Sequence, residues 1–208
     1  MKKFILLSAV LLAVCLVLTG CGAKAAPAEK VTAPAAEGML SGSYTAEIKI
    51  KDYGTVIFSM DADKASATVT NFVTLAKAGF YDGLTFHRII DGFMIQGGDP
   101  LGNGTGGSEQ KIKGEFSANG VKNDQSHTRG AVSMARSSAM DSASSQFFIV
   151  QKDSKYLDGQ YACFGYVTEG MDVVDAICKN TPVTDNNGSV KPENQPVIES
   201  VRITEPAA

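Results

Sequence analysis

Alternating apolar and polar residues predict β-strands near both ends of the folded part of the chain. The alternation runs through residues 44–50 and 54–60, which are joined by a turn over residues 52–54. It returns in residues 196–203. A period of two is typical of a strand with one buried face, so these stretches predict two adjoining strands and a closing strand.

Two other stretches follow the helical period. Residues 67–78 place apolar side chains three and four positions apart, and Gly79 suits the end of a helix. Residues 171–179 repeat the pattern more briefly. Many short strands, two helices and one long glycine-rich connection favour a mainly β domain closed into a barrel.

The most informative stretch is residues 86–99, in which two apolar runs flank Asp91-Gly92. An Asp-Gly pair between apolar runs predicts a tight hairpin. Arg88 lies inside the first run, where a permanent charge needs partners if it is buried. Two interpretations stay open: Arg88 reaches solvent from an edge strand, or it is held at the floor of an apolar pocket by an amide such as Gln96.

A two-residue turn at this hairpin would pair Ile90 with Phe93. Arg88 would then lie opposite Ile95, and Gln96 would face the other side of the sheet. A contact between Arg88 and Gln96 therefore requires a bulge or a longer turn.

Four strings, FHRIIDGFMIQGGD, GAVSMAR, SSQFFIV and YLDGQYACFG, together resemble the cyclophilin family of peptidyl-prolyl isomerases. They cover the chain from about residue 43 to residue 204. The resemblance implies a closed eight-stranded antiparallel barrel capped by two α-helices. It also implies an isomerase that turns X–Pro bonds in proline-containing peptides and unfolded exported proteins, with no cofactor and no metal.

The resemblance assigns roles to particular residues. Arg88 is the implied hydrogen-bond donor to the prolyl nitrogen, Gln96 orients it, and Phe93 completes the catalytic set. The implied substrate contacts are Met94, Phe148 and Leu157, which with Phe93 line the proline pocket, Ala135, Arg136 and Gln146 beside the peptide backbone, and also Tyr156 and Tyr161.

Three positions depart from the best-known eukaryotic members. Tyr156 stands where they have tryptophan, Tyr161 where they have histidine, and Arg136 where asparagine is common. The segment 137–144 is one residue longer. We expect weak inhibition by cyclosporin, because the indole N–H donor is lost.

The N-terminus predicts export. Lys2 and Lys3 precede an apolar run over residues 4–18, too short to span a membrane comfortably. The following Leu-Thr-Gly-Cys looks like a bacterial lipobox, which implies a signal peptide over residues 1–20 and a lipid on Cys21. We expect residues 21–42 to be a flexible linker, residues 43–208 the isomerase domain, and the protein to be anchored outside the cell membrane as a monomer.

Charge and cysteine content narrow the possible functions. The chain has 19 basic and 22 acidic residues, a net charge of −3, or −5 without the two N-terminal lysines. No basic block is present, so nucleic acid is not an expected partner. Of the four cysteines, Cys15 leaves with the signal peptide; we expect Cys163 and Cys178 to be small buried side chains, although pairing stays open.

Other motifs suggest alternative functions. Residues 102–107 contain GxGxxG, but Asp99-Pro100 precedes them and no helical pattern follows, so a mobile surface loop is expected instead of a nucleotide site. His87 and His127 are too few for a histidine-rich metal site, although either could activate Ser133 or Ser145 in a hydrolase. A non-catalytic module that binds proline peptides is the other alternative.

Overall fold

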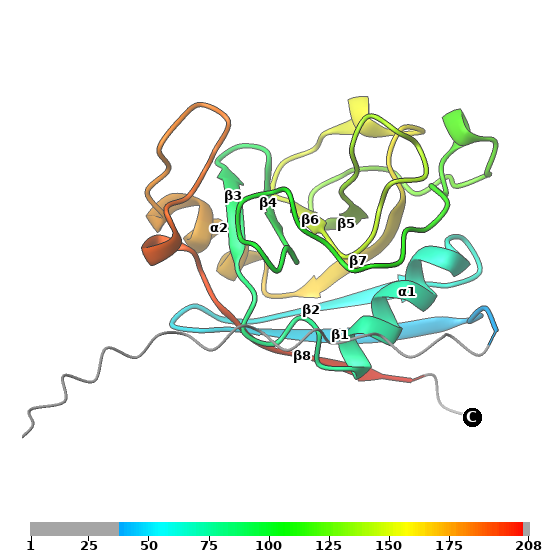
Figure 1. Cartoon of the computed structure of the whole chain (residues 1–208), viewed down its shortest axis with the longest axis horizontal. Helices are drawn as coiled ribbons and strands as arrows, with labels where there is room; N and C mark the ends of the chain where they lie inside the picture. Colours follow the sequence, from blue (N-terminus) through cyan, green and yellow to red (C-terminus); the bar gives the residue numbers. More distant parts are fainter. Residues whose placement is uncertain (1–37, 206–208) are drawn as a thin grey trace, which may run out of the picture.

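The computed structural model describes residues 38–205, which form one curled β-sheet with two α-helices (Figure 1). The helices are α1 (Ser66–Lys77) and α2 (Met171–Asn180). The strands are β1 (Ser43–Ile50), β2 (Gly54–Asp61), β3 (Phe86–Ile90), β4 (Met94–Gly97), β5 (Ala131–Met134), β6 (Phe147–Val150), β7 (Cys163–Glu169) and β8 (Ile198–Thr204). Short 3₁₀ turns occupy Ser117–Asn119, Lys155–Leu157 and Pro192–Asn194.

All neighbouring strands are antiparallel, in the order β3-β4-β6-β5-β7-β2-β1-β8. The two ends of this order approach each other just before β3 and β8. Thr85 and Val197 form a β-bridge there, and the Phe86 amide donates to the Pro196 carbonyl over 3.0 Å. The predicted mainly β, eight-stranded antiparallel architecture with two helices is confirmed, and its seam is a short bridge instead of a full ladder.

The core is aromatic and lies inside the curl of the sheet. Phe72 of α1 packs edge-on against Phe147 of β6 and Phe58 of β2, with ring centroids 5.5 and 5.6 Å apart. Phe164 and Tyr81 complete the cluster, and all five rings are fully buried. Burial of this much aromatic surface fixes α1 against the sheet. Figure 1 shows α1 and α2 toward opposite ends of the molecule.

The N-terminus of α1 is capped by a residue far away in the sequence. Ala65, at the N-cap position, makes no side-chain cap. The buried carboxylate of Glu115 accepts hydrogen bonds from the amides of Ala67 and Thr68, at 3.0 and 2.8 Å, and from the Thr68 hydroxyl at 2.7 Å. A carboxylate at a helix N-terminus satisfies free amides and favours the helix dipole. It also ties the segment before the first 3₁₀ turn to α1.

The hairpin between β3 and β4 has a longer turn than the simplest interpretation of Asp91-Gly92. The Phe93 amide donates to the Ile90 carbonyl over 3.0 Å, and Gly92 has a φ of 78°, a value that favours glycine. Ile90 pairs with Met94, so three residues, not two, form the loop. The simplest two-residue turn, which would place Arg88 opposite Ile95, is therefore not the turn that forms.

This extra loop residue brings Arg88 directly opposite Gln96. A further shift between Phe86 and Arg88 makes His87 the extra residue of a bulge. The longer turn that the resemblance required is therefore present. Arg88 and Gln96 face the same side of the sheet.

Other sequence predictions have clear outcomes in the described residues. Cys163 in β7 and Cys178 in α2 are free and buried, as expected. The glycine-rich loop lies at the surface as predicted, but its backbone is tied down, because the Asp99 carboxylate accepts from the amides of Leu101, Asn103 and Gly104. No helix follows it, in keeping with the rejected nucleotide fingerprint.

The predictions for the signal peptide, Cys21 and most of the linker concern residues 1–37, which lie outside the described part of the chain. Neither α1 nor α2, the two α-helices within residues 38–205, has the length and apolar character needed to cross a bilayer.

Candidate active site

Arg88 lies on β3 with its guanidinium half-buried and held from two sides. Nη1 donates to Oε1 of Gln96 over 3.2 Å. Nε donates to the carbonyl of Asn187 over 2.8 Å, and Nη2 donates to Oδ1 of the same residue over 3.1 Å. Burial lowers the pKa of Arg88 from its usual value, but an arginine remains charged at neutral pH.

Gln96 is itself fixed by a second amide. Its Nε2 donates to Oε1 of Gln146 over 2.9 Å, and Nε2 of Gln146 donates to the Gly106 carbonyl over 2.7 Å. The amides thus form a directed row from the glycine-rich loop to Arg88. A row of this kind leaves Gln96 one orientation, with its oxygen toward the guanidinium.

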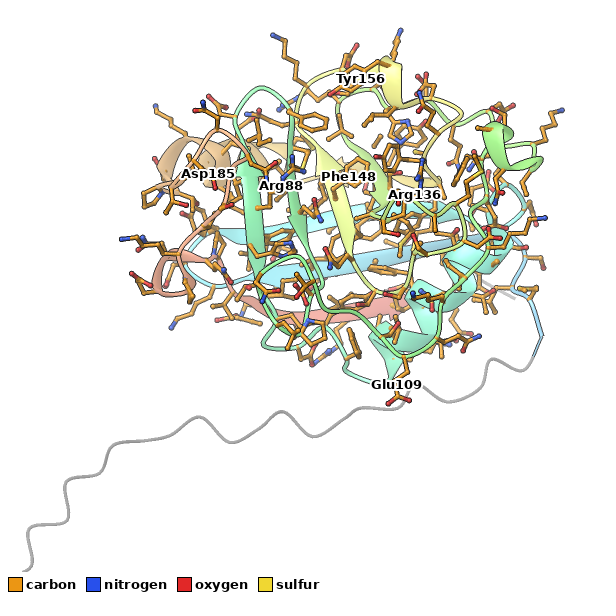
Figure 2. The ribbon with its side chains drawn as sticks, turned by 45° about the horizontal axis from the view of Figure 1, so that its top comes forward. Arg88, Glu109, Arg136, Phe148, Tyr156 and Asp185 are labelled. Atoms are coloured by element: carbon orange, nitrogen blue, oxygen red, sulfur yellow. The ribbon has the colours of Figure 1, made fainter. Side chains whose placement is uncertain are left out.

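An apolar cluster lies beside this polar row. Its buried members are Met94, Ala131, Phe148, Val150 and Cys163, and partly buried side chains pack around them: Ile90, Phe93, Ala135, Leu157, Tyr161 and Tyr166. All predicted proline-pocket residues (Phe93, Met94, Phe148 and Leu157) belong to this cluster. In Figure 2 the labelled Phe148 lies between Arg88 and Arg136.

Two tyrosines form the rim of the apolar cluster. Tyr156, in the 3₁₀ turn Lys155–Leu157, is 66% exposed, and its ring centroid lies 6.0 Å from that of Phe93. Tyr161 packs edge-on against Phe148 with the centroids 6.0 Å apart. Partly exposed rings next to a buried one make a shallow apolar patch open to solvent, which suits a small ring such as that of proline.

Arg136 lies on the same face as Arg88, but its guanidinium is bonded to backbone carbonyls of the neighbouring loops. Nε and Nη2 both donate to the Gln160 carbonyl, over 3.0 and 2.9 Å, and Nη1 donates to the Ser137 carbonyl over 2.9 Å. Its guanidinium also lies over the rings of Tyr161 and Phe116, at 4.7 and 5.1 Å. These contacts fix the loops that contain Ser137 and Gln160, and they occupy most of the N–H donors of Arg136.

A cavity of about 380 Å³ extends from the amide row toward the glycine-rich loop. Its lining includes Gln96, Ala135, Arg136 and Gln146 together with residues 104–108 of the glycine-rich segment. The Ala135 amide is already bonded to the Gln146 carbonyl over 2.9 Å. The residues predicted to contact a peptide backbone therefore do lie together, in a groove that continues from the apolar patch.

Ser133, His127 and Asp158 form a hydrogen-bonded row beneath Phe148. Nδ1 of His127 lies 2.8 Å from Oδ1 of Asp158, and Nε2 lies 3.0 Å from the Ser133 hydroxyl. Burial lowers the pKa of His127, against the attraction of Asp158. Ser133 and His127 are both 0% exposed, so no substrate reaches this hydroxyl. The geometry does not support the hydrolase alternative.

The His127 ring is stacked 6.1 Å from the Phe148 ring, with an interplanar angle of 16°. The buried row therefore supports the floor of the apolar patch from behind. His127 and Ser133 were candidates by residue type alone, and no local pattern in the sequence connects either of them to Asp158.

Asn187 is a site residue that no pattern in the sequence predicted. It lies 99 positions from Arg88, and the Asn187-Gly188 pair by itself indicates only a turn. No local signal connects that turn to Arg88.

Comparison with known proteins agrees with the geometry. The family model described as cyclophilin type peptidyl-prolyl cis-trans isomerase/CLD matches residues 45–204. A peptidyl-prolyl cis-trans isomerase of Helicobacter pylori strain J99 is 49% identical over 123 residues, which cover 58% of this chain and 71% of the relative. Peptidyl-prolyl cis-trans isomerase B of Bacillus subtilis is 45% identical over 123 residues, covering 59% of this chain and 82% of the relative.

A solved structure gives the same result. The cyclophilin type peptidyl-prolyl cis-trans isomerase of Cryptosporidium parvum, crystallised in the presence of the dipeptide Ala-Pro, superposes with a TM-score of 0.68 at 29% identity. The match covers 78% of this chain and 99% of that chain. The chain therefore belongs to the cyclophilin-type family of peptidyl-prolyl cis-trans isomerases and is an enzyme of that class.

Proposed function

We propose that this isomerase acts on exported proteins, rotating X–Pro bonds by stabilising the twisted amide with Arg88. The single observation that carries the mechanism is a clamped guanidinium, held by Gln96 and Asn187, at the border of the apolar cluster that contains Phe148. A fixed cation next to a ring-sized apolar patch provides both parts that the reaction needs.

The reaction breaks no covalent bond. Rotation about X–Pro faces a barrier near 20 kcal/mol, because the C–N bond has partial double-bond character. Uncatalysed exchange takes about ten to a hundred seconds at room temperature. A catalyst lowers the barrier by binding the twisted form, in which resonance is lost, more tightly than either planar isomer.

In our proposal the proline ring rests on Phe148 and Met94, with Leu157 and Phe93 at its sides, while the peptide backbone lies along the amide row. When resonance is lost, the prolyl nitrogen regains a lone pair. An N–H of Arg88 donates to that lone pair, an interaction that the planar amide offers only weakly. Gln96 keeps the donor in place, so little reorganisation accompanies rotation.

The cellular role rests on the N-terminal sequence. We infer that residues 1–20 direct export and that Cys21 carries the lipid, with the linker to residue 42 giving the domain reach from the membrane surface. Acyl chains contribute about 0.8 kcal/mol per buried methylene, so a multiply acylated cysteine anchors stably. Replacing Cys21 with alanine should move the protein out of the membrane fraction; retention there would contradict the anchor.

The experiment that tests the mechanism is NMR exchange of a short Ala-Pro peptide with the full chain and with Arg88→Ala, both shown to be folded. We expect the variant to lose about a hundredfold or more in exchange rate while still binding the peptide. Unchanged exchange in the variant would refute the role of Arg88. A wild type that binds without accelerating exchange would favour the alternative, a proline-peptide binding module.

A further inference from the structure

The segment after α2 returns to the edge of the sheet next to Arg88. The Ile89 amide donates to the Gly188 carbonyl over 2.8 Å, and the Val190 amide donates to the His87 carbonyl over 3.0 Å. Arg88 and Ser189 form an isolated antiparallel bridge. The segment therefore serves as a short additional strand along β3, and its position relative to Arg88 is set by backbone hydrogen bonds.

Gly188 makes this close approach possible. Its φ is 81°, and a Cβ atom at this position would lie 2.2 Å from the Ile89 carbonyl oxygen. Only glycine fits there. The preceding residue, Asn187, is thereby placed against the side of the guanidinium.

Asn187 accepts two hydrogen bonds from one edge of the Arg88 guanidinium. Its carbonyl accepts from Nε and its Oδ1 accepts from Nη2, while Gln96 takes one N–H of Nη1. Arginine has five N–H donors in a rigid plane. Three are used by these neighbours, and two remain for a substrate. The side-on fork fixes the plane of the guanidinium as a carboxylate would.

All three acceptors are neutral. Within residues 38–205 Arg88 makes no ion pair. Asp185 lies in the same segment, but its Oδ1 accepts from the amides of Asn187 and Ser189, at 2.9 and 3.0 Å, and so stabilises the turn. Figure 2 shows Asp185 on the Arg88 side of the site. A carboxylate in the fork would orient Arg88 equally well but would offset its charge, and donation to a lone pair weakens accordingly.

We propose that Asn187 is a positioning residue that orients Arg88 through a neutral fork and leaves its charge available to the prolyl nitrogen. The inference rests on the proposed role of Arg88 and deepens it. It differs from a structural role, in which Arg88 serves only to hold the 183–190 segment in place.

The test compares two adjacent asparagines. Asn187→Ala and Asn187→Asp are made beside Asn186→Ala and Asn186→Asp, since Asn186 is exposed in the same turn and makes no hydrogen bond to Arg88. Exchange of the Ala-Pro peptide and its dissociation constant are measured by NMR from pH 7 to pH 3, each variant relative to wild type and each shown to be folded at every pH. The titratable groups acting on Arg88 are Asp185, Tyr156, Tyr161 and the adjacent His87.

We expect Asn187→Asp to slow exchange about tenfold at pH 7, with peptide affinity within twofold. Its deficit should shrink only at the acid end of this range, because the charge of Arg88 lowers the pKa of the new carboxylate below its usual value. Asn187→Ala should slow exchange several-fold at every pH, and both Asn186 variants should stay within twofold of wild type.

Two results would overturn the inference while leaving the isomerase mechanism intact. The first is that the Asn187 variants exchange the peptide as fast as the Asn186 controls do, while Arg88→Ala is inactive. The second is equal, pH-independent losses in Asn187→Ala and Asn187→Asp accompanied by weaker peptide binding, which indicates a loop that has lost its structure. An active Arg88→Ala would instead refute the proposed mechanism itself.

Discussion

Arg88 and Arg136 lie on the same face of the molecule, yet their surroundings prepare them for different tasks. Arg88 is held by Gln96 on one side and by Asn187 on the other, and two of its N–H donors make no hydrogen bond within residues 38–205. Arg136 gives four N–H groups to carbonyls of its own loops, including that of Ser138 at 3.4 Å, and lies over two aromatic rings.

In the proposed mechanism the two arginines have different roles, and charge on this face does not by itself show which of them donates to the substrate. What distinguishes the two is the number of donors that remain after the protein's own carbonyls have been satisfied, and how rigidly those donors are held. Arg136 stabilises the entrance of the groove. Arg88 is a preorganised donor.

Replacing each arginine with lysine should separate these roles most strongly. Lysine keeps the charge but cannot fill a side-on fork. We expect Arg88→Lys to lose about a hundredfold in kcat/KM for a proline peptide, or about 2.7 kcal/mol. Arg136→Lys should lose less than about threefold. Equal losses in the peptide exchange assay would remove the distinction between the two arginines.

A substitution at Glu115 tests whether the region around Arg136 has a mainly structural role. Glu115 precedes Phe116, over whose ring the Arg136 guanidinium lies. Glu115→Ala leaves two amides of α1 and the Thr68 hydroxyl without their acceptor, so we expect the free energy of unfolding to fall by about 2 kcal/mol. Denaturant unfolding measures this, with Glu115→Gln as the milder control. Exchange by the folded fraction should be unchanged; a large rate loss there would link this region to catalysis.

A substitution at Gln96 tests how much its hydrogen bond to Arg88 contributes to catalysis. Gln96→Ala removes the acceptor of Nη1 and one end of the amide row. We expect about a tenfold loss in kcat/KM, equivalent to about 1.4 kcal/mol. Gln146→Ala, one step farther from Arg88, should lose about threefold. A reversed order would mean that the row acts on the peptide directly.

Two buried histidines should make the free energy of unfolding depend on pH. Burial lowers the pKa of His87, next to Arg88, and of His127, beneath Phe148. The unfolded chain therefore takes up protons below its histidine pKa of about 6.5, while the folded chain stays neutral until its lower pKa is reached. The histidine contribution to stability should be fully present above the unfolded pKa of about 6.5. It should decrease as the pH falls from there toward the lower pKa of the folded protein.

The expected loss is at most about 1.4 kcal/mol per pH unit for each histidine. Neither ring nitrogen of His87 has a hydrogen-bond partner among the described residues, so His87→Leu should remove its share of the slope at little cost in stability. Unfolding curves at pH 7 and pH 5.5 measure both effects. An unchanged slope in His87→Leu would show that folding does not lower the pKa of this histidine.

The smallest effect is expected at the rim. Tyr156→Trp restores the indole N–H that the best-known eukaryotic members carry, so cyclosporin should bind about threefold more tightly than to the wild type, which we expect to be inhibited weakly. Inhibition constants measure this. Nanomolar inhibition of the wild type would contradict the prediction.

Much of this site could be predicted from the sequence, because its motifs are long and local. The strings around Arg88, Ser133, Phe148 and Leu157 identified the family and predicted proline-pocket residues that the structure brings together in one apolar cluster. The alternation of residues 44–50 and 54–60 and the helical period of residues 67–78 predicted elements that the structure confirms to within a residue or two at each end.

The register of the hairpin could not be derived in this way. Asp91-Gly92 predicted a turn correctly, but the type of turn depends on backbone torsions, and one residue more or less reverses the face on which every following side chain lies. Only the tertiary structure brought Gln96 level with Arg88.

What the sequence determined by itself is the composition of each element and the chemistry of its motifs, because periodicity and turn residues act over a few positions. The tertiary structure alone decided which distant groups meet: Asn187 with Arg88, Glu115 with the first turn of α1, and Asp158 with His127. Such contacts depend on how the sheet curls and closes, and chain-distant pairs leave no local signal. Arg88 was therefore visible in the sequence, but the fork that orients it was not.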